Sequence, residues 1–279
     1  MPIRSLLYVP ASNARALEKS RSLSCDGVII DLEDAVAPQA KAAARAALPA
    51  ALEGGAGRNR LRLVRINALS SPWGQDDLVA LGGLGCDGVA VPKVSGPADL
   101  DAVAARCDLP LWAMIETARG VLSAPAICGH PRLAGVIMGT NDLARELGAR
   151  PRADRMPLWT ALQGVLLAAR AAGVPAIDGV CNALDEPERF AAECVQGRDM
   201  GFDGKSLIHP AQIAAANAAF APSADEIDLA RRRIAGFEAA QAAGQGVAVV
   251  DGEIVEALHV ETARKTLALA ERIAAEVDA

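Results

Sequence analysis

The chain has 279 residues, of which 52% are hydrophobic and 22% are charged. This composition supplies enough apolar side chains for a large core and excludes a disordered protein. Lys and Arg number 28 against 34 Asp and Glu, and the resulting net charge of −6 argues against a nucleic-acid-binding protein. No run of about 20 apolar residues is present, so we expect neither a membrane span nor a signal peptide, and we expect a cytoplasmic protein.

The six cysteines are scattered along the chain, at positions 25, 86, 107, 128, 181 and 194. They form no C-x-x-C pair and no Cys/His cluster with the spacing of a zinc site. The pattern indicates buried free thiols in a reducing compartment rather than a disulfide framework.

From Ser5 onward the sequence repeats one unit, a short apolar run followed by a turn and an Ala-rich helical stretch. The runs predict strands at Ser5–Val9, Gly27–Leu32, Leu61–Ile66, Gly88–Val91, Leu111–Ile115, Gly135–Met138, Ala176–Asp178 and Lys205–Ile208. Most of them are almost continuously apolar, which is typical of strands covered on both faces. The intervening segments predict helices at Ala14–Ser22, Lys41–Leu52, Asp99–Arg106 and Leu158–Ala172.

Eight such units predict an α/β fold, a closed (β/α)8 or TIM barrel over residues 1–220. The alternative is an open doubly wound sheet. That fold usually carries a G-x-G-x-x-G turn after a strand, and no strand is followed by one here.

After Pro210 the alternation ends. The sequence predicts helices at Ala211–Ala219 and Ala224–Gln241, a hairpin at Val247–Glu253 around Asp251-Gly252, and a last helix at Val260–Val277. We assign residues 221–279 to a C-terminal extension, too small for an independent domain, that acts as a lid or packs on a neighbouring subunit.

Polar residues follow several of the predicted strands, at the end of a parallel barrel where active sites form. These strand ends carry Asp31-Leu-Glu33-Asp34, Arg65-Ile-Asn67, Lys93, Glu116-Thr117, Gly139-Thr140-Asn141-Asp142, Asp178-Gly179 and His209-Pro210. Several carboxylates on one rim would repel each other, so we expect a cation or a substrate to compensate them.

Glu116 and Asp142 follow consecutive strands, so their carboxylates can converge. Two carboxylates with water and substrate oxygens suit a hard six-coordinate cation, chiefly Mg²⁺. The alternative is that each residue caps the helix that follows, which Asp142 in particular could do.

Three further features of the rim suit anion binding. Arg65 offers a planar fork for a carboxylate or an enolate oxygen, but it could instead form a structural ion pair with the acidic cluster at residues 31–34. Lys93 could meet a phosphate or simply pair with Asp34. The turn at Gly139 and Thr140 could present N–H groups to an anion, although a tight turn also needs glycine.

The three histidines carry no recognisable catalytic arrangement. His130 and His209 each precede a proline in a turn, and His259 lies in the tail. No Ser-His-Asp or Cys-His arrangement and no P-loop is present, so nucleophilic catalysis and a nucleotide-phosphate loop are not expected.

Taken together, seven motifs in this order resemble the citrate lyase β-subunit-like family of CoA-ester lyases, within the HpcH/HpaI aldolase superfamily. They are Arg4-Ser-Leu-Leu-Tyr-Val-Pro10, Asp31-Leu-Glu-Asp-Ala-Val36, Val64-Arg-Ile-Asn67, Val91-Pro-Lys93, Ile115-Glu-Thr117, Gly139-Thr-Asn-Asp142 and Lys205-Ser-Leu-Ile-His-Pro210. The resemblance implies a trimeric or hexameric (β/α)8 barrel that binds Mg²⁺ and cleaves or forms a carbon–carbon bond beside a thioester.

By position, Glu116 and Asp142 match the metal ligands of the resembled family, and Arg65 matches the arginine that binds the oxo-acid or thioester oxygen. The family's carboxylate-binding loop corresponds to the backbone of Gly139, Thr140 and Asn141. We also expect Lys93 to bind substrate, with Glu33 and Asp34 supporting the site. Asn141 stands where the family often has Glu.

The resemblance extends to the tail. Members that act on CoA esters carry an Asp in a stretch like D-G-x-M-x-D, which reaches the active site of a neighbouring subunit. Here the stretch is Asp251-Gly-Glu-Ile-Val-Glu256, so Glu256 takes that position. The implied reaction is a retro-Claisen or retro-aldol cleavage of citramalyl-, malyl- or citryl-CoA to an acyl thioester and a 2-oxo acid, in which Arg65 stabilises the enolate and Glu256 handles the proton.

Three other functions remain open at this point. A class II pyruvate aldolase would act on free 2-oxo acids, but it would need a histidine after an early strand, where none occurs. A β subunit of a citrate lyase complex would act on an acyl-carrier protein. A barrel that binds a CoA ester as a regulator, without turnover, is the third.

Overall fold

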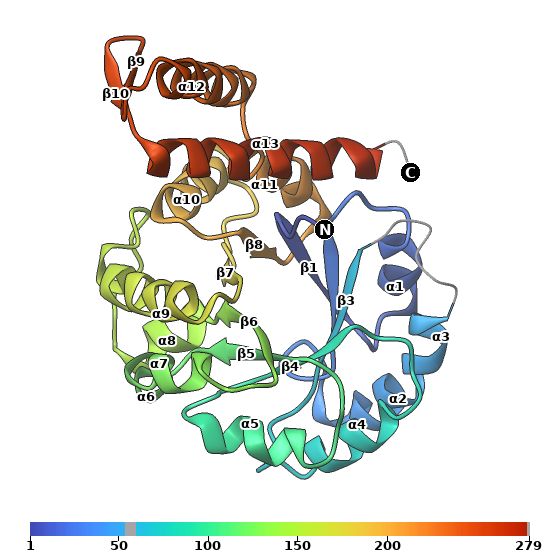
Figure 1. Ribbon diagram of the computed structural model, residues 1–279. Coiled ribbons are helices and arrows are strands. Elements are labelled where there is room, and N and C mark those ends of the chain that lie inside the picture. The colour runs from blue at the N-terminus through green and yellow to red at the C-terminus, as the bar shows by residue number, and fades with distance from the viewer. Residues whose placement is uncertain (54–59, 278–279) are drawn as a thin grey trace. The chain divides into compact units, whose positions relative to one another are not determined.

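The computed structural model describes residues 1–53 and 60–277 (Figure 1). The chain divides into two compact units: Ile3–Phe220 forms the first, and Ala221–Ala279 together with Met1–Pro2 forms the second. In the described part of the chain, no helix is both long enough and apolar enough to cross a membrane.

The first unit is a closed barrel of eight parallel strands, which confirms the predicted fold. The strands are β1 (Ser5–Pro10), β2 (Gly27–Asp31), β3 (Leu61–Arg65), β4 (Gly88–Val91), β5 (Leu111–Ile115), β6 (Leu133–Met138), β7 (Ala176–Asp178) and β8 (Gly204–Leu207). The barrel closes where β1 pairs with β8, with Leu6 opposite Ser206. All eight lie within two residues of the predicted bounds, because short apolar runs between turns are a strong strand signal.

Helices follow the strands and surround them (Figure 1). They are α1 (Ala14–Ser20), α2 (Lys41–Ala46), α3 (Leu48–Leu52), α4 (Gly74–Ala80), α5 (Pro97–Ala104), α6 (Ala118–Leu122), α7 (Ala124–Cys128), α8 (Thr140–Glu146), α9 (Trp159–Ala172), α10 (Pro187–Met200) and α11 (Ile213–Ala219), with short 3₁₀ turns η1 (Pro38–Ala40), η2 (Met156–Leu158) and η3 (Pro210–Gln212). The helix predicted over Lys41–Leu52 is divided at Ala47, because Pro49 lacks an N–H and favours the first turn of a new helix.

Alternate residues of each strand face opposite sides, and the two sides form separate cores. One core lies inside the barrel and includes Leu6, Ile29, Leu63, Trp112, Met114, Ile137 and Ile177. The other lies between the strands and the helices and includes Leu7, Val28, Val64, Val136 and Leu207 with helix residues such as Leu100 and Leu162. The side of the strand on which a polar residue falls therefore decides whether it faces the barrel axis or a helix.

The second unit contains α12 (Ala224–Ala242), the hairpin β9 (Ala248–Val250) and β10 (Glu253–Val255), and α13 (Ala257–Val277). Its small core consists of Phe237, Ala240, Ala248, Val255 and Val260. The hairpin turns at Asp251 and Gly252, which have φ of 54° and 84°; both values lie in the left-handed region that a tight hairpin turn requires. The predicted hairpin was thus correct, with its second strand two residues longer.

All six cysteines are free, five of them buried and Cys107 partly buried. This agrees with the absence of a disulfide pattern in the sequence.

Candidate active site

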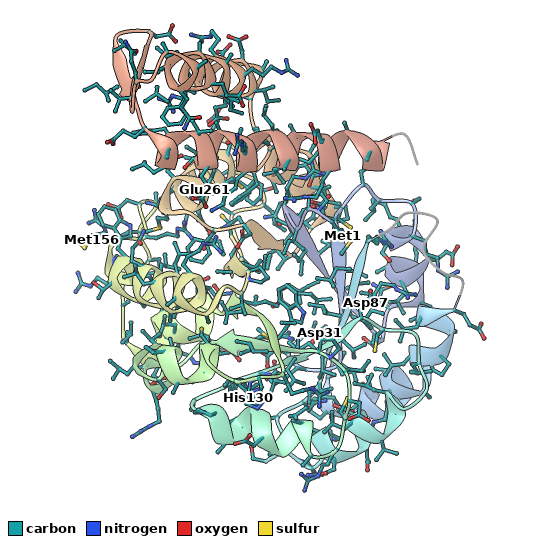
Figure 2. All side chains as sticks on the ribbon, in the orientation of Figure 1. Met1, Asp31, Asp87, His130, Met156 and Glu261 are labelled. Atoms are coloured by element: carbon teal, nitrogen blue, oxygen red, sulfur yellow. The ribbon has the colours of Figure 1, made fainter. Side chains whose placement is uncertain are left out.

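A cavity of about 310 Å³ opens at the carboxyl ends of the barrel strands. Its lining includes six residues that the sequence predicted as metal ligands or substrate-binding groups: Arg65, Glu116, Gly139, Thr140, Asn141 and Asp142. It also includes Asp34, which the sequence predicted as a supporting residue. Tyr8, Asp31, Met114, Met138, Val180 and Ile208 complete most of the wall. Figure 2 shows Asp31 among the strands at the centre of the barrel.

Arg65 is held by carboxylates on the neighbouring strand. Its Nε and Nη2 donate to the two oxygens of Asp31 at 2.7 and 2.6 Å, and its Nη1 lies 3.0 Å from Glu33 Oε2. Burial alone would lower the pKa of Arg65, but the hydrogen bonds and charge of Asp31 raise it. The guanidinium therefore stays charged, and Nη1 is the one nitrogen of the fork that Asp31 does not bind.

The ring of Tyr8 packs against Arg65, with the guanidinium carbon 4.9 Å from the ring centre. Burial raises the pKa of the Tyr8 phenol, so the group stays protonated beside the acidic cluster. Tyr8 is a site residue that the sequence did not predict, whereas Asp31 forms the ion pair with Arg65 that the sequence offered as an alternative. The alternation of side chains along a strand could have identified Tyr8, because it lies two residues after Leu6, which faces the barrel interior.

Glu116 follows β5 and is 3% exposed. Its Oε1 accepts the backbone N–H of Lys93 at 2.7 Å. Burial, and secondarily the charge of Glu33, raises the pKa of Glu116 to about 7. A carboxylate so destabilised in its charged form gains most from a nearby cation.

Gly139 leaves the space into which Glu116 extends. A Cβ at position 139 would lie 2.3 Å from Glu116 Oε2, far closer than carbon and oxygen atoms approach. The N–H of Gly139 itself donates to Ile115 O at 3.0 Å. The N–H groups free to meet a ligand at this turn are therefore those of Thr140 and Asn141, since a helix leaves its first N–H groups unpaired.

Asp142 lies in the first turn of α8, three residues after the N-cap Gly139. It is not the N-cap itself, so the capping alternative is wrong. Its Oδ1 forms an ion pair with Arg145 Nη2 at 2.6 Å, and its Oδ2 lies 4.0 Å from Lys93 Nζ.

Lys93 adopts a left-handed conformation, with φ of 54°. Such backbone strain is unusual outside glycine and is often found at functional sites. Here it allows the N–H of Lys93 to reach Glu116 while Nζ forms a short ion pair with Glu33 and lies 4.0 Å from Asp34. The predicted pairing with Asp34 is thus secondary to the pairing with Glu33.

The donor set of this cavity fits a hard divalent cation. Within residues 1–53 and 60–277, no cluster of three or more His, Cys, Asp or Glu could hold a metal, so the protein would offer two carboxylates, Glu116 and Asp142. Mg²⁺ is commonly bound by one or two carboxylates, with water and substrate oxygens completing its shell. Glu116 Oε2 has no hydrogen-bond partner among the described residues and borders the cavity, as such a ligand requires.

A buried lysine fixes the loop that carries Glu33. Lys41 Nζ donates to the carbonyls of Leu32 and Glu33 and to Asn67 Oδ1, at 2.7–2.8 Å. Asn67 in turn is bound to Asp77. Asn67, which the sequence placed on the rim, therefore does not line the cavity but helps to hold the loop that carries Glu33.

Asp178 does not belong to the site, contrary to expectation. It is fully buried on the outer face of β7 and pairs with Arg155 and Lys205, each at 2.8 Å. Its neighbour Ile177 faces the barrel interior, so Asp178 must face α10. His209 accepts the N–H of Ala211 as the cap of η3, and His130 bonds the N–H of Arg132; both are structural, as expected.

Glu256 lies in the second unit, directly before α13, and is exposed. Its N–H donates to His259 Nδ1 at 3.0 Å, and its carboxylate makes no hydrogen bond or ion pair with the described residues. The cavity of the barrel unit does not include it.

Comparison with known proteins decides the family. Residues 4–210 match the family described as HpcH/HpaI aldolase/citrate lyase. The chain belongs to this family. The resemblance seen in the motifs is confirmed across three quarters of the sequence.

Relatives extend the match to the whole chain. A protein named (3S)-malyl-CoA thioesterase, from Cereibacter sphaeroides strain KD131, is 58% identical over 275 residues, covering 98% of this chain and 96% of that protein. A citrate lyase subunit beta-like protein from Deinococcus radiodurans is 39% identical over 276 residues, with 95% and 96% covered. The crystal structure of CitE from Mycobacterium tuberculosis with magnesium, acetoacetate and coenzyme A has a TM-score of 0.83 at 32% identity, covering 97% of this chain and 98% of that one.

Proposed function

We propose that this protein is a Mg²⁺-dependent carbon–carbon lyase of the CoA-ester type. Its substrate is the CoA ester of a 3-hydroxy acid that carries a carboxylate on C3, such as malyl-, citramalyl- or citryl-CoA. Its products are an acyl thioester and a 2-oxo acid. The observation that carries the proposal is the convergence of Glu116, Asp142 and Arg65 on one cavity in a barrel of this family. The magnesium and coenzyme A in the related CitE structure support the same assignment.

Glu116 and Asp142 would hold the cation, which when bound supplies a Lewis acid for the hydroxyl and carboxylate oxygens of the acyl group. The N–H groups of Thr140 and Asn141 would bind that carboxylate. Lys93 binds Glu116 through its N–H and Glu33 through its side chain, and so its charge partly offsets the repulsion between the two carboxylates.

Cleavage requires the hydroxyl to lose its proton while the bond between C2 and C3 breaks. The bonding electrons then form the enolate of the departing thioester, which takes up a proton at carbon. Arg65 would stabilise the enolate oxygen through Nη1, the nitrogen of the fork that Asp31 does not bind and that would have to exchange Glu33 for the substrate. Glu256 of a neighbouring subunit would carry the proton, in a homotrimer or homohexamer.

The test is an assay of malyl-, citramalyl- and citryl-CoA with and without Mg²⁺, in which the acyl-CoA and the 2-oxo acid are measured by chromatography. We expect Mg²⁺-dependent formation of both products, in equal amounts, from at least one ester. Failure to form a 2-oxo acid from any of them would contradict the lyase proposal.

The name of the 58%-identical relative favours a second candidate, hydrolysis of the malyl-CoA thioester. In that reaction water adds to the thioester carbonyl, the C–S bond breaks, and the thiol leaves with a proton. The same cavity would serve, since the acyl carboxylate and hydroxyl bind alike. Release of free CoA thiol and malate without glyoxylate would favour hydrolysis, and acetyl-CoA with glyoxylate would favour cleavage of the carbon–carbon bond.

A further inference from the structure

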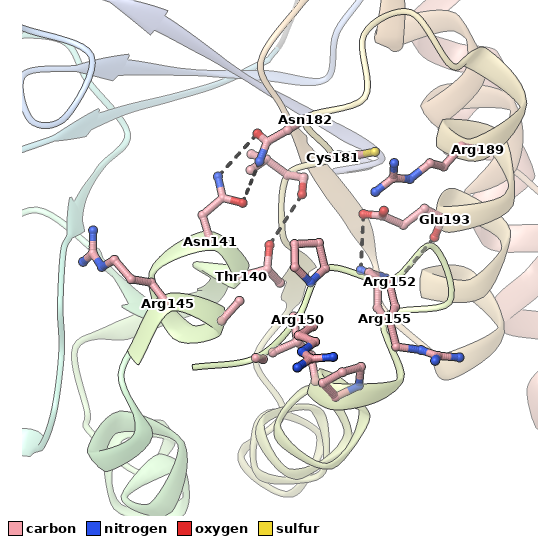
Figure 3. Close-up of a pocket in the computed structure, with 16 residues that line it drawn as sticks. Thr140, Asn141, Arg145, Arg150, Arg152, Arg155, Cys181, Asn182, Arg189 and Glu193 are labelled. Atoms are coloured by element: carbon pink, nitrogen blue, oxygen red, sulfur yellow. Dashed lines mark hydrogen bonds and ion pairs between the residues drawn. The ribbon is translucent and has the colours of Figure 1, made fainter. Parts of the chain in front are cut away.

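A second cavity of about 360 Å³ lies beside the candidate active site, between α8, η2 and α10 (Figure 3). The two cavities share Thr140, Asn141 and Val180 in their linings. Asn141 and Asn182 are hydrogen-bonded to each other on this common wall, with 2.8 Å between Asn182 Nδ2 and Asn141 Oδ1. The motifs that define the family site do not account for this cavity.

The lining carries an unusual concentration of guanidinium groups. Its charged members are Arg145, Arg150, Arg152, Arg155, Arg189 and Glu193. The one carboxylate among them, Glu193, already bonds Lys205 Nζ at 2.8 Å and lies 3.5 Å from Arg155 Nη1. It is therefore not available to neutralise the other arginines.

Three of the arginines are paired elsewhere. Arg145 bonds Asp142 at 2.6 Å, Arg152 bonds Asp154 at 2.6 Å, and Arg155 bonds Asp178 at 2.8 Å.

Arg150 and Arg189 differ from these three arginines because each has guanidinium N–H groups without an acceptor among the residues that the structure describes. Across the described ranges 1–53 and 60–277, Arg150 makes no hydrogen bond and no ion pair. Arg189 pairs through Nη1 with Glu186 at 3.1 Å, but its Nε is buried without any partner. Figure 3 shows Arg189 extending from α10 beside Glu193. A buried guanidinium N–H without an acceptor is costly, and an oxyanion is the acceptor that its planar fork suits best.

The rest of the wall limits the ligand. Small and apolar side chains line the cavity between the arginines: Ala144, Ala149, Pro151, Pro157, Leu158 and Val180. Such a wall favours a short carbon skeleton over a fully hydrated inorganic ion. The unpaired guanidinium of Arg150 and the unpartnered Nε of Arg189 lie in one cavity, which favours two anionic groups on that skeleton.

We propose that this cavity is a separate binding site for a small organic dianion, held by Arg150 and Arg189. The charged groups are carboxylates or a phosphate ester, because the guanidinium fork bonds both. The site uses neither Glu116 nor Arg65, so it requires no metal and does not depend on the reaction proposed above.

Isothermal titration in the presence of EDTA tests the proposal, because chelation removes metal-bridged binding at the barrel mouth. The probes are succinate for dicarboxylates and glycerol 3-phosphate for phosphate esters, with acetate as a single-charge comparison. We expect at least one dianion to bind wild-type protein more tightly than acetate. Its affinity should fall at least tenfold in Arg150→Gln and in Arg189→Gln, and should be unchanged in Arg65→Gln.

Arg198→Gln is the matched control, since Arg198 lies on the same helix as Arg189, outside the cavity, and pairs with Asp199. Arg189→Lys keeps the charge but removes Nε, so it should weaken binding if the buried N–H is used. Circular dichroism establishes that each variant is folded, and Arg150, being exposed, is expected to tolerate replacement. The proposal is overturned if neither dianion binds, or if binding survives in both Arg150→Gln and Arg189→Gln.

Discussion

Arg65 is bound by Asp31 in a geometry that a lysine cannot reproduce. The two hydrogen bonds of 2.7 and 2.6 Å use two nitrogens of one planar fork, and the same plane packs on Tyr8. Arg65→Lys keeps the charge but loses both features. We expect kcat to fall by about 10²-fold or more, because the role proposed for Arg65 is to stabilise charge that develops in the transition state.

Arg62→Lys is the control for this change, since Arg62 is on the same strand but bonds Asp87 at the opposite end. Steady-state kinetics on both variants separate the two roles of Arg65. A normal kcat with a raised KM in Arg65→Lys would show that Arg65 only binds substrate.

Gly139 is required by the position of Glu116. A Cβ there would meet Glu116 Oε2 at 2.3 Å, so Gly139→Ala must displace the carboxylate. We expect Mg²⁺ affinity, measured by titration calorimetry, to fall by about 10- to 100-fold. A loss of this size is typical when a residue that positions a metal ligand is replaced. Gly164→Ala in α9 is the control, because no atom lies within 4 Å of the added carbon and the helix should gain about 0.5–1 kcal/mol in stability. Equal Mg²⁺ affinity in both variants would count against Glu116 as a ligand.

Two features together decide which polar residues line the cavity: their position at the end of a strand, and the side of the strand on which the side chain lies. The ends of the apolar runs were sufficient to predict Arg65, Glu116 and Asp142. They could not exclude Asp178. A strand that is apolar on both faces shows no alternation of polar and apolar residues, so the sequence does not tell which residues face the barrel interior. Nor could they show that Arg65 would bond Asp31 rather than Asp34, a choice that depends on side-chain geometry between neighbouring strands.

At the scale of elements, a buried ion cluster joins β7, β8 and α10. Lys205 is fully buried and bonds Asp178 and Glu193 at 2.8 Å, and Arg155 bonds Asp178 from the segment before α9. Nothing in the sequence predicts that Lys205 in β8 and Glu193 in α10 form a buried ion pair. Only the fold shows that they meet.

This cluster makes stability depend on pH. Burial alone would raise the pKa of Asp178, but Lys205 and Arg155 lower it. The stabilisation by Asp178 is therefore present above its unfolded pKa of about 3.9 and is lost as pH falls through the lower folded value. Burial alone would lower the pKa of Lys205, but Asp178 and Glu193 raise it, so its stabilisation is present below about pH 10.4 and is lost as pH rises further.

Asp178→Asn leaves Lys205 and Arg155 short of a counter-charge. We expect it to reduce the free energy of unfolding at pH 7 by about 3–5 kcal/mol, with the difference from wild type narrowing below pH 4. Urea denaturation from pH 3 to pH 9 measures this, with exposed Asp199→Asn as the control. A constant difference across that range would contradict the role of Asp178.

At the scale of the whole molecule, the chain forms two units, and the residue predicted to handle the proton is in the second. Glu256 is exposed, and its carboxylate has no partner among the described residues. A carboxylate at a helix start is often only a solvated stabiliser of the helix. Its position in the stretch that resembles D-G-x-M-x-D is what favours a role in a neighbouring subunit's site.

Subunit mixing tests this role. Glu256→Gln subunits and Asp142→Ala subunits are each expected to be inactive, whereas mixed oligomers contain some sites with both groups intact. Activity should therefore reappear after subunit exchange, with mass spectrometry establishing that mixed oligomers formed. Mixed oligomers without activity, together with a fully active Glu256→Gln enzyme, would exclude the shared site.

The central claim is that Glu116 and Asp142 hold the Mg²⁺ on which activity depends. Calorimetric titration of Mg²⁺ into Glu116→Ala and Asp142→Ala tests it most directly. Glu146→Ala, an exposed carboxylate on the same helix as Asp142, is the control. We predict that both site variants remain folded, since they relieve repulsion in an acidic cluster, and that both lose measurable Mg²⁺ binding while Glu146→Ala binds normally. Unaltered Mg²⁺ affinity in both site variants would contradict the claim.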